Sequence, residues 1–300
     1  MEKEKRPVYL FKKGMVLEDV LKTFLLNEIR FLLNISLFVT QDKDIEDLHD
    51  FRVVNRRSRG VLKLFRRYTD KEKSAEVLKL LKEIFEATGH IRDYDIFLKY
   101  IFDYKQKLPQ MEENLHILQR YISEKRDQEF LRLKSFLESD LFKHKITRLL
   151  DVVNGEGFFL KKDLFFSEAI KNILKKNMKK LDDLFGTDLK DANDFHIHKI
   201  RIELKKIRYL FDIFKSFFKK KYYRKILEAL KNVQDLLGKN QDLVFQLNFV
   251  KNYEKATSKS LKDLFEFIIK QKQENMAEFI SRYEELKDIL PKNKHRRLLK

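Results

Sequence analysis

Two short motifs constrain the fold of this 300-residue chain more than any other feature, because each occurs twice at the same spacing. The pattern His-x2-Arg-x3-basic-basic-x-Arg-x5-Phe begins at His49 and again at His198. The pattern Gly-x3-Asp begins at Gly89 and again at Gly238, so both motifs recur after 149 residues. A shared offset with no net insertion between the motifs indicates a tandem duplication of a unit of roughly 140 to 150 residues.

The repeated unit is predicted to be helical throughout, which makes the expected fold class all-α. Only 7 Gly and 3 Pro occur, too few for the many tight turns of a sheet-rich fold. Long stretches rich in Lys, Glu, Leu, Phe and Ile favour helices, and the 43% hydrophobic content is enough for a packed core. Helices are predicted at 15–40, 45–68, 72–88, 91–107, 111–138 and 140–153, and then at 162–185, 194–220, 222–237, 239–255 and 258–288.

The duplication divides the chain into two halves. An N-terminal tail (1–14) precedes the first helical half (15–154), and a Gly-containing linker follows at 154–157. The second half (160–290) is followed by a basic tail (291–300). Because duplicated helical units often pack as one body, we expect two pseudo-symmetric helical bundles with a basic groove or pore between them.

The charge of the chain predicts an anionic partner. The 65 basic residues outnumber the 47 acidic ones, which gives a formal net charge of +18. Nucleic acid, acidic lipid and phosphate polymers are the partner classes that such an excess favours. A surface rich in ion pairs would explain the high charged content but not the excess of basic residues. The absence of Cys excludes disulfides and Cys-based zinc sites.

No membrane segment or secretory signal is recognisable, so the expected location is the cytoplasm. The apolar segment 24–39 carries Glu28 and Arg30, which is typical of a buried amphipathic helix and not of a membrane span. The first 14 residues are charged and lack an apolar region with a cleavage site.

The His-x2-Arg motif predicts a cationic stripe along one helix. At 100° per residue, five side chains fall within an arc of about 80°, opposite a core face that contains Phe51 and Leu62. These five are His49, Arg52, Arg56, Arg59 and Lys63. Like charges at this spacing repel each other, and a linear polyanion would neutralise the whole row. A single stripe of this kind is usually a solvated face, but two copies at a fixed offset favour a binding face.

The second copy of the motif repeats the stripe with one difference. His198, Arg201, Lys205 and Arg208 occupy the same arc, and Asp212 stands where the first copy has Lys63. Arginine can hold phosphate oxygens with two hydrogen bonds at once, while lysine supplies a mobile point charge. The two halves are therefore expected to contribute unequally.

Taken together, these motifs resemble those of the CHAD family, the conserved-histidine α-helical domain. The resemblance rests on the segments 49–65, 89–95, 198–209 and 234–242 and spans both halves of the chain. It implies two helical halves related by a pseudo-twofold axis, with a basic groove or pore between them that binds inorganic polyphosphate. Polyphosphate granules are then one expected place of association.

The resemblance also implies which residues contact the anion. Arg57 and Lys206 lie outside the main stripe, and Gln241 replaces the basic residue that would match Arg92. The expected polyphosphate-binding residues are His49, Arg52, Arg56, Arg57, Arg59, Lys63 and Arg92 in the first half, and His198, Arg201, Lys205, Lys206 and Arg208 in the second.

Three alternatives to polyphosphate binding remain open at this stage. His49-Asp50 resembles the dipeptide of metal-dependent HD phosphohydrolases, but the second copy has His198-Lys199 and the surrounding cations disfavour a divalent ion. Weak non-specific nucleic-acid binding fits the charge, although few aromatic residues interleave the stripe for base stacking. A scaffold that uses some of the 27 Phe side chains is the third. The chain is expected to have no catalytic residues, metal or cofactor, and the sequence gives no oligomeric state or polymer-length preference.

Overall fold

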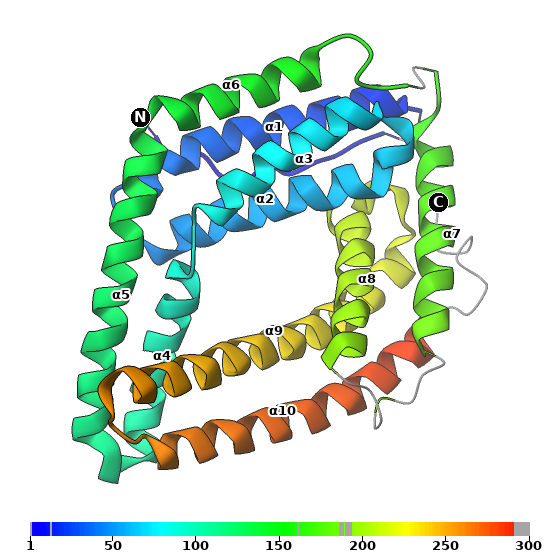
Figure 1. The fold of residues 1–300 in the computed structure, drawn as a ribbon. Coiled ribbons are helices and arrows are strands. Elements are labelled where there is room, and N and C mark those ends of the chain that lie inside the picture. The colour runs from blue at the N-terminus through cyan, green and yellow to red at the C-terminus, as the bar shows by residue number, and fades with distance from the viewer. Residues whose placement is uncertain (1, 13, 161–162, 186–188, 190–193, 291–300) are drawn as a thin grey trace.

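A computed structural model describes residues 2–12, 14–160, 163–185, 189 and 194–290, and this part of the chain is all-α (Figure 1). Short 3₁₀ turns join some of the helices, among them η1 (Arg66–Tyr68) and η4 (Lys215–Phe217). The α-helices are α1 (Leu17–Val39), α2 (Ile45–Phe65), α3 (Lys71–Glu86), α4 (Ile91–Lys107), α5 (Glu112–Glu138), α6 (Asp140–Asn154), α7 (Phe166–Phe185), α8 (Asp194–Ile213), α9 (Lys220–Thr257) and α10 (Lys262–Ile289).

The helices are arranged as a four-sided frame (Figure 1). Helices α4 and α5 form one side, α9 and α10 the next, and α7 and α8 the third. The fourth side is thicker and contains α1, α2, α3 and α6. On the inner edge of this frame, α2, α4, α8 and α9 face one another across a common space.

Two hydrophobic clusters hold the frame together. The larger one joins α1, α2, α3 and α6 to α7 and α8, and Phe65, Phe166 and Phe214 pack at its centre. The smaller one fixes α4 and α5 against α9 and α10 around Phe97 and Tyr104. Full burial of such side chains stabilises the fold by about 1.5 to 3 kcal/mol each. The four inner helices are therefore set in rigid positions.

Helices of the second half begin 149 residues after their counterparts in the first. Helix α7 begins at Phe166, α8 at Asp194 and α9 at Lys220, whereas α1, α2 and α3 begin at 17, 45 and 71. The 3₁₀ turn η4 likewise follows η1 at this offset.

Several contacts between the halves join residues at this same offset. Val16 forms an antiparallel bridge with Phe165. The rings of Phe65 and Phe214 pack with centroids 5.8 Å apart. At the crossing of α2 and α8, a Cβ atom on Gly60 would lie 2.5 Å from the ring of Tyr209, so the close approach of these helices requires glycine there.

The prediction of two helices at 222–237 and 239–255 is wrong, because α9 runs without a break from Lys220 to Thr257. In the first half Gly89 has φ +47 and separates α3 from α4, since its left-handed conformation ends a helix. Gly238 stays inside α9, where glycine costs only about 1 kcal/mol. The whole length of α9 packs against α10 and the neighbouring sides, which offsets that cost.

Smaller differences occur at helix ends and in the tails. Helix α2 ends at Phe65 and α8 at Ile213, each before a 3₁₀ turn that the predictions of 45–68 and 194–220 had included. The segment predicted as an N-terminal tail packs on both halves: Tyr9 and Phe11 are buried and stacked on each other, and their rings contact Phe24 and Phe214. The basic tail predicted at 291–300 lies outside the described residues. Within the described part, no helix combines the length and apolarity that crossing a membrane requires.

Candidate functional site

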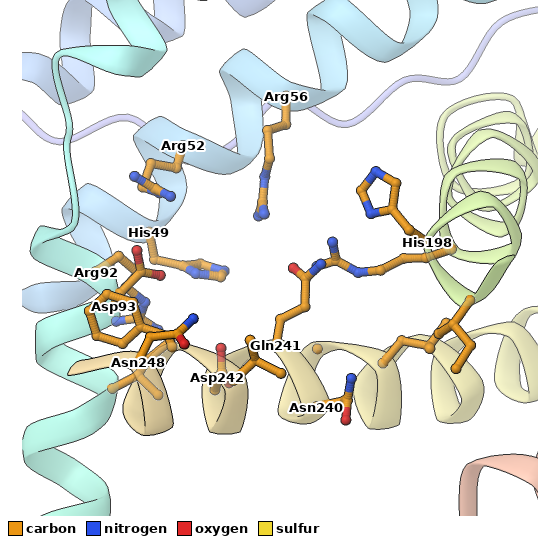
Figure 2. Close-up of a pocket in the computed structure, with 17 residues that line it drawn as sticks. His49, Arg52, Arg56, Arg92, Asp93, His198, Asn240, Gln241, Asp242 and Asn248 are labelled. Atoms are coloured by element: carbon orange, nitrogen blue, oxygen red, sulfur yellow. The ribbon is translucent and has the colours of Figure 1, made fainter. Parts of the chain in front are cut away.

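A cavity of about 610 Å³ lies between the four inner helices, and we refer to it as the central cavity (Figure 2). Helices α2 and α8 supply most of its basic side chains, and α4 and α9 supply a mixed, largely polar wall. Six of the residues predicted from the motifs line it: His49, Arg52, Arg56, Arg92, His198 and Arg201. The other polar side chains on its wall are Asp93, Asn240, Gln241, Asp242 and Asn248.

The sequence of α2 explains why its basic side chains face this space. Asp44 caps the helix, and its carboxylate accepts a hydrogen bond from the backbone N–H of Glu46 at 2.9 Å. Phe51, Val54 and Phe65 are fully buried on the opposite face of the helix. Burying that face leaves the stripe of His49, Arg52 and Arg56 directed into the central cavity, as Figure 2 shows.

Arg52 is held in place by the end of α3. Its guanidinium donates a hydrogen bond to the Gly89 carbonyl at 3.1 Å and another to the Thr88 hydroxyl. It also lies 4.6 Å from the centroid of the Phe85 ring, a cation–π contact. These partners are all neutral, so the positive charge of Arg52 is oriented without being cancelled.

Arg56 and Arg201 bring two further charges to the central cavity from opposite sides. Arg56 points from α2 into the open space (Figure 2), and α8 contributes Arg201. Within the described residues, no carboxylate lies within ion-pair distance of either guanidinium. The buried Nε of Arg201 makes no hydrogen bond to this part of the protein. Both groups therefore present unused hydrogen-bond donors.

Arg92 extends the basic lining to α4. Its Nη2 lies 3.4 Å from the Glu46 carboxylate at the edge of the central cavity. Its Nε and Nη1 are buried and make no hydrogen bond within the described ranges. Burial, followed by repulsion from Arg92, lowers the pKa of the neighbouring His49. At neutral pH this wall therefore consists of permanent guanidinium charges around a neutral imidazole.

Lys205 lies on α8 next to the arginines and has a strongly shifted pKa. Burial lowers this pKa to about 7, and repulsion from Arg201, Arg56 and Arg208 adds to the effect. In the described chain no carboxylate is within ion-pair distance of its ammonium group. Lys205 therefore loses its proton near neutral pH unless a negative charge comes close.

Two carboxylates also line the central cavity, and the motifs did not identify them as part of a site. Asp93 on α4 lies 2.9 Å from Nδ1 of His90. Asp242, 149 residues later, lies on α9. Burial raises the pKa of Asp242 to about 6, and repulsion from Asp93 raises it further while Arg201 and Arg92 oppose the shift. Both belong to the Gly-x3-Asp motif, which at the level of sequence served only as evidence of the repeat and of the family resemblance.

Three of the predicted residues do not line the central cavity and are paired with other protein groups. Arg57 forms a buried ion pair with Glu28, whose carboxylate also accepts a hydrogen bond from Tyr9. Lys206 pairs with Glu203 at 2.5 Å. Arg208 contacts Asp212 at 3.2 Å and the Gln234 side chain at 3.1 Å.

Arg59 and Lys63 continue the stripe of α2 beyond the central cavity. The guanidinium of Arg59 lies 5.4 Å from the centroid of the Phe85 ring. Lys63 borders a different cavity, at the far end of the helix. The sequence pattern alone could not separate these positions from Arg52 and Arg56, because all four lie on the same face of α2.

No group of three or more His, Asp or Glu side chains in the described residues is placed to hold a metal ion. The pair His49-Asp50 is part of no such group. Asp50 instead forms an ion pair with Arg6 at 3.3 Å.

Comparison with protein-family models gives a match to the CHAD domain over residues 24–251. The structure is similar to the crystal structure of the CHAD domain from the plant Ricinus communis, with a TM-score of 0.71, 20% identity and coverage of 96% of this chain and 95% of that one. It is also similar to PptA from Streptomyces chartreusis, with a TM-score of 0.64, 13% identity and coverage of 92% and 98%. Comparison with curated proteins gave no match.

Proposed function

This chain belongs to the CHAD domain family, and from the arrangement of its central cavity we propose that it binds inorganic polyphosphate without cleaving it. The observation that carries the proposal is the meeting of Arg52, Arg56, Arg92 and Arg201 in one cavity. Of these four, only Arg92 has a carboxylate within ion-pair distance in the described chain, and that contact is 3.4 Å long. The cavity thus holds an excess of positive charge that a ligand must neutralise.

A phosphate polymer fits this arrangement better than a single small anion. The basic groups come from helices on three sides of the cavity, so one phosphate cannot reach all of them. A chain with one negative charge per unit can contact several guanidinium groups at once, and each contact is a charge-assisted hydrogen bond. The donors of Arg92 and Arg201 that are buried without a protein partner would be satisfied by phosphate oxygens.

We further infer that the two halves arose by internal duplication, which gives the polymer equivalent contacts on both sides. The shared offset of 149 residues in motifs and in helix starts supports this inference. The equivalence is incomplete, because Gln241 takes the place that corresponds to Arg92. On this basis α2 and α4 contribute more of the binding energy than α8 and α9.

The double substitution Arg52→Ala and Arg56→Ala tests the proposal. Loss of two charge-assisted contacts is expected to weaken polyphosphate binding roughly a hundredfold. Isothermal titration calorimetry with long-chain polyphosphate measures the change, and far-UV circular dichroism checks that helicity is retained. Because Arg52 also contacts Thr88 and Gly89, the single substitution Arg56→Ala, which removes no hydrogen bond to the described residues, is measured beside it.

A matched control removes the same charge from the outside of the frame. Arg120 and Arg132 are exposed on α5, away from the central cavity. Arg120→Ala with Arg132→Ala is expected to change affinity only slightly. Equal losses in the two double variants would mean that binding follows net charge and not the cavity, which contradicts the proposal.

Two further measurements separate polyphosphate binding from the other functions that the sequence left open. Competition by single-stranded RNA at matched charge and salt is expected to be weak, because the two helices that carry the stripes offer few aromatic side chains for base stacking. Incubation of polyphosphate with the protein and Mg²⁺ or Mn²⁺ is expected to release no phosphate. Phosphate release that is lost in the Arg56→Ala variant would establish a hydrolase instead.

A further inference from the structure

A second basic cavity of about 500 Å³ lies at the other end of α2, and we refer to it as the distal cavity. It is bordered by the last turn of α2, the 3₁₀ turn η1, the start of α3 and the middle of α7. Five of its nine lining residues are basic: Lys63, Arg66, Arg67, Lys71 and Lys176. The other four are apolar or amide side chains, so no acidic or aromatic residue lines it.

The charges of the distal cavity are not cancelled by the protein. In the described parts of the chain, no carboxylate lies within ion-pair distance of any of these five side chains. The guanidinium of Arg67 lies over the ring of the neutral Tyr68, 4.5 Å from its centroid, and donates a hydrogen bond to the Tyr68 hydroxyl. Burial lowers the pKa of Lys63, and repulsion from Arg59 and Lys206 adds to this. An anion placed here would remove that repulsion.

The stripe on α2 connects the two cavities. Arg56 lines the central cavity, Lys63 lines the distal cavity, and Arg59 lies between them. At 100° per residue the three side chains fall within an arc of about 60°. Seven residues separate Arg56 from Lys63, which corresponds to roughly 10 Å along the helix axis. A flexible anionic chain is long enough to span this distance on the Arg59 side of the contact between Gly60 and Tyr209.

The second half keeps only part of this cluster. Residues 149 positions after Lys63 and Arg67 are Asp212 and Ser216, and Asp212 pairs with Arg208 at 3.2 Å. The counterparts of Arg66 and Lys71 are still basic, namely Lys215 and Lys220. The helical framework at this position therefore forms with fewer basic groups than the distal cavity has.

We propose that the distal cavity is a second phosphate-polymer subsite, occupied by the part of a long polyphosphate chain that extends beyond the central cavity. This inference rests on the proposed function, because the same polymer occupies both cavities. A phosphate polymer is favoured over a nucleic acid because the described residues that line the cavity include no aromatic side chain on which a base could stack. The two subsites together select for chain length, since only a long chain reaches both.

The test compares the affinities for a short and a long polyphosphate in a variant that removes three of the five positive charges of the distal cavity. Arg66, Lys71 and Lys176 are exposed, and none of them lines the central cavity. The triple variant Arg66→Gln, Lys71→Gln, Lys176→Gln is expected to bind long-chain polyphosphate on the order of tenfold more weakly at physiological salt. Binding of tripolyphosphate is expected to remain within twofold of wild type, because three phosphates cannot extend from Arg52 to Arg66, about 21 Å apart along α2.

A second triple variant controls for net charge. Lys107→Gln, Lys255→Gln and Lys259→Gln remove three exposed charges from the opposite end of the frame. This control is expected to bind both ligands nearly as wild type does. Circular dichroism and thermal melting verify that both triple variants are folded.

The outcomes distinguish this inference from the proposed function. If both triple variants bind long polyphosphate equally well, the second subsite is wrong while binding in the central cavity stands. If the distal variant loses affinity for single-stranded RNA but not for polyphosphate, the distal cavity serves nucleic acid and the inference is overturned. If wild-type protein binds neither phosphate ligand, the proposed function fails and this inference fails with it.

Discussion

At the scale of single residues, burial and neighbouring like charges change the protonation of side chains in and beside the central cavity. Lys205 has a pKa of about 7 because it is buried and surrounded by Arg201, Arg56 and Arg208. Asp242 has a pKa raised to about 6 by burial and by Asp93. Both groups titrate close to neutral pH, where free lysine and aspartate side chains do not. Anion binding is therefore expected to be coupled to proton uptake.

Polyphosphate affinity is predicted to fall as the pH rises from about 6 to 9. In the free protein Lys205 loses its proton as pH passes its pKa of about 7, whereas a bound polyanion favours the protonated ammonium. Protonation of His49 and Asp242 at lower pH acts in the same direction. Titration calorimetry at a series of pH values, in buffers of different ionisation enthalpy, measures both the affinity and the protons taken up.

The variant Lys205→Arg isolates the contribution of this lysine. An arginine stays charged over the whole range, so the decrease in affinity above pH 7 is expected to flatten. A steep decrease that persists unchanged in Lys205→Arg would show that Lys205 has no part in it. An affinity that does not vary with pH in the wild type would also show that protonation of the His49 imidazole does not contribute to binding.

At the scale of helices, two glycines at equivalent positions in the motif have different structural roles. Gly89 has φ +47, and a Cβ atom there would collide with the Glu129 carboxylate. Gly238 is inside α9, and a Cβ atom there would meet nothing within 4 Å. The turn at Gly89 separates α4 from α3, and α4 carries Arg92 to the central cavity. In α9 the uninterrupted helix forms the opposite wall.

Substitution of these two glycines by alanine is predicted to have opposite effects on stability. Gly89→Ala is expected to lower the free energy of unfolding by about 1 to 2 kcal/mol, because alanine disfavours positive φ and the site is crowded. Gly238→Ala is expected to raise it by about 0.5 to 1 kcal/mol through helix propensity. Urea unfolding without ligand measures both changes. Changes of the same sign would contradict the assignment of a turn to one position and a continuous helix to the other.

At the scale of the whole molecule, the net charge of +18 lowers the stability of the four-sided frame. Repulsion among the basic groups disfavours the compact state, and the two hydrophobic clusters oppose that repulsion. A polyanion that binds only the folded protein shifts this balance. At a concentration a hundredfold above its Kd, such a ligand stabilises the fold by about 2.7 kcal/mol.

Salt is predicted to raise the melting temperature of the free protein and to reduce the further increase that polyphosphate causes. Raising the salt concentration screens the repulsion and is expected to increase the melting temperature of the free protein. The additional increase caused by polyphosphate is expected to shrink, because salt weakens the contacts with phosphate. Thermal melting at several salt concentrations, with and without the polymer, measures both effects. The Arg52→Ala, Arg56→Ala variant should keep the first effect and lose most of the second, and a ligand effect that is independent of salt would contradict electrostatic binding.

The sequence alone determined the all-α class, most helix positions and the CHAD family, and the structure and the comparisons confirm them. These properties depend on the spacing of apolar residues and on motif spacing, which are local in the chain. The stripes also identified five residues that line the central cavity, since a stripe opposite a buried face must face outward from its own helix, and the family resemblance added Arg92.

Only the tertiary structure decided which members of the stripes meet and which are paired with protein groups. Arg57 is buried against Glu28, a partner 29 residues away on another helix, and no local pattern encodes that contact. Asp93 and Asp242 face the same cavity because α4 and α9 approach each other in space. Likewise, Gly89 ends a helix and Gly238 does not, because packing against α10 overrides the weak local preference of glycine in α9. Local spacing fixes the direction of a side chain on its own helix, but its neighbours and its protonation depend on how distant segments pack.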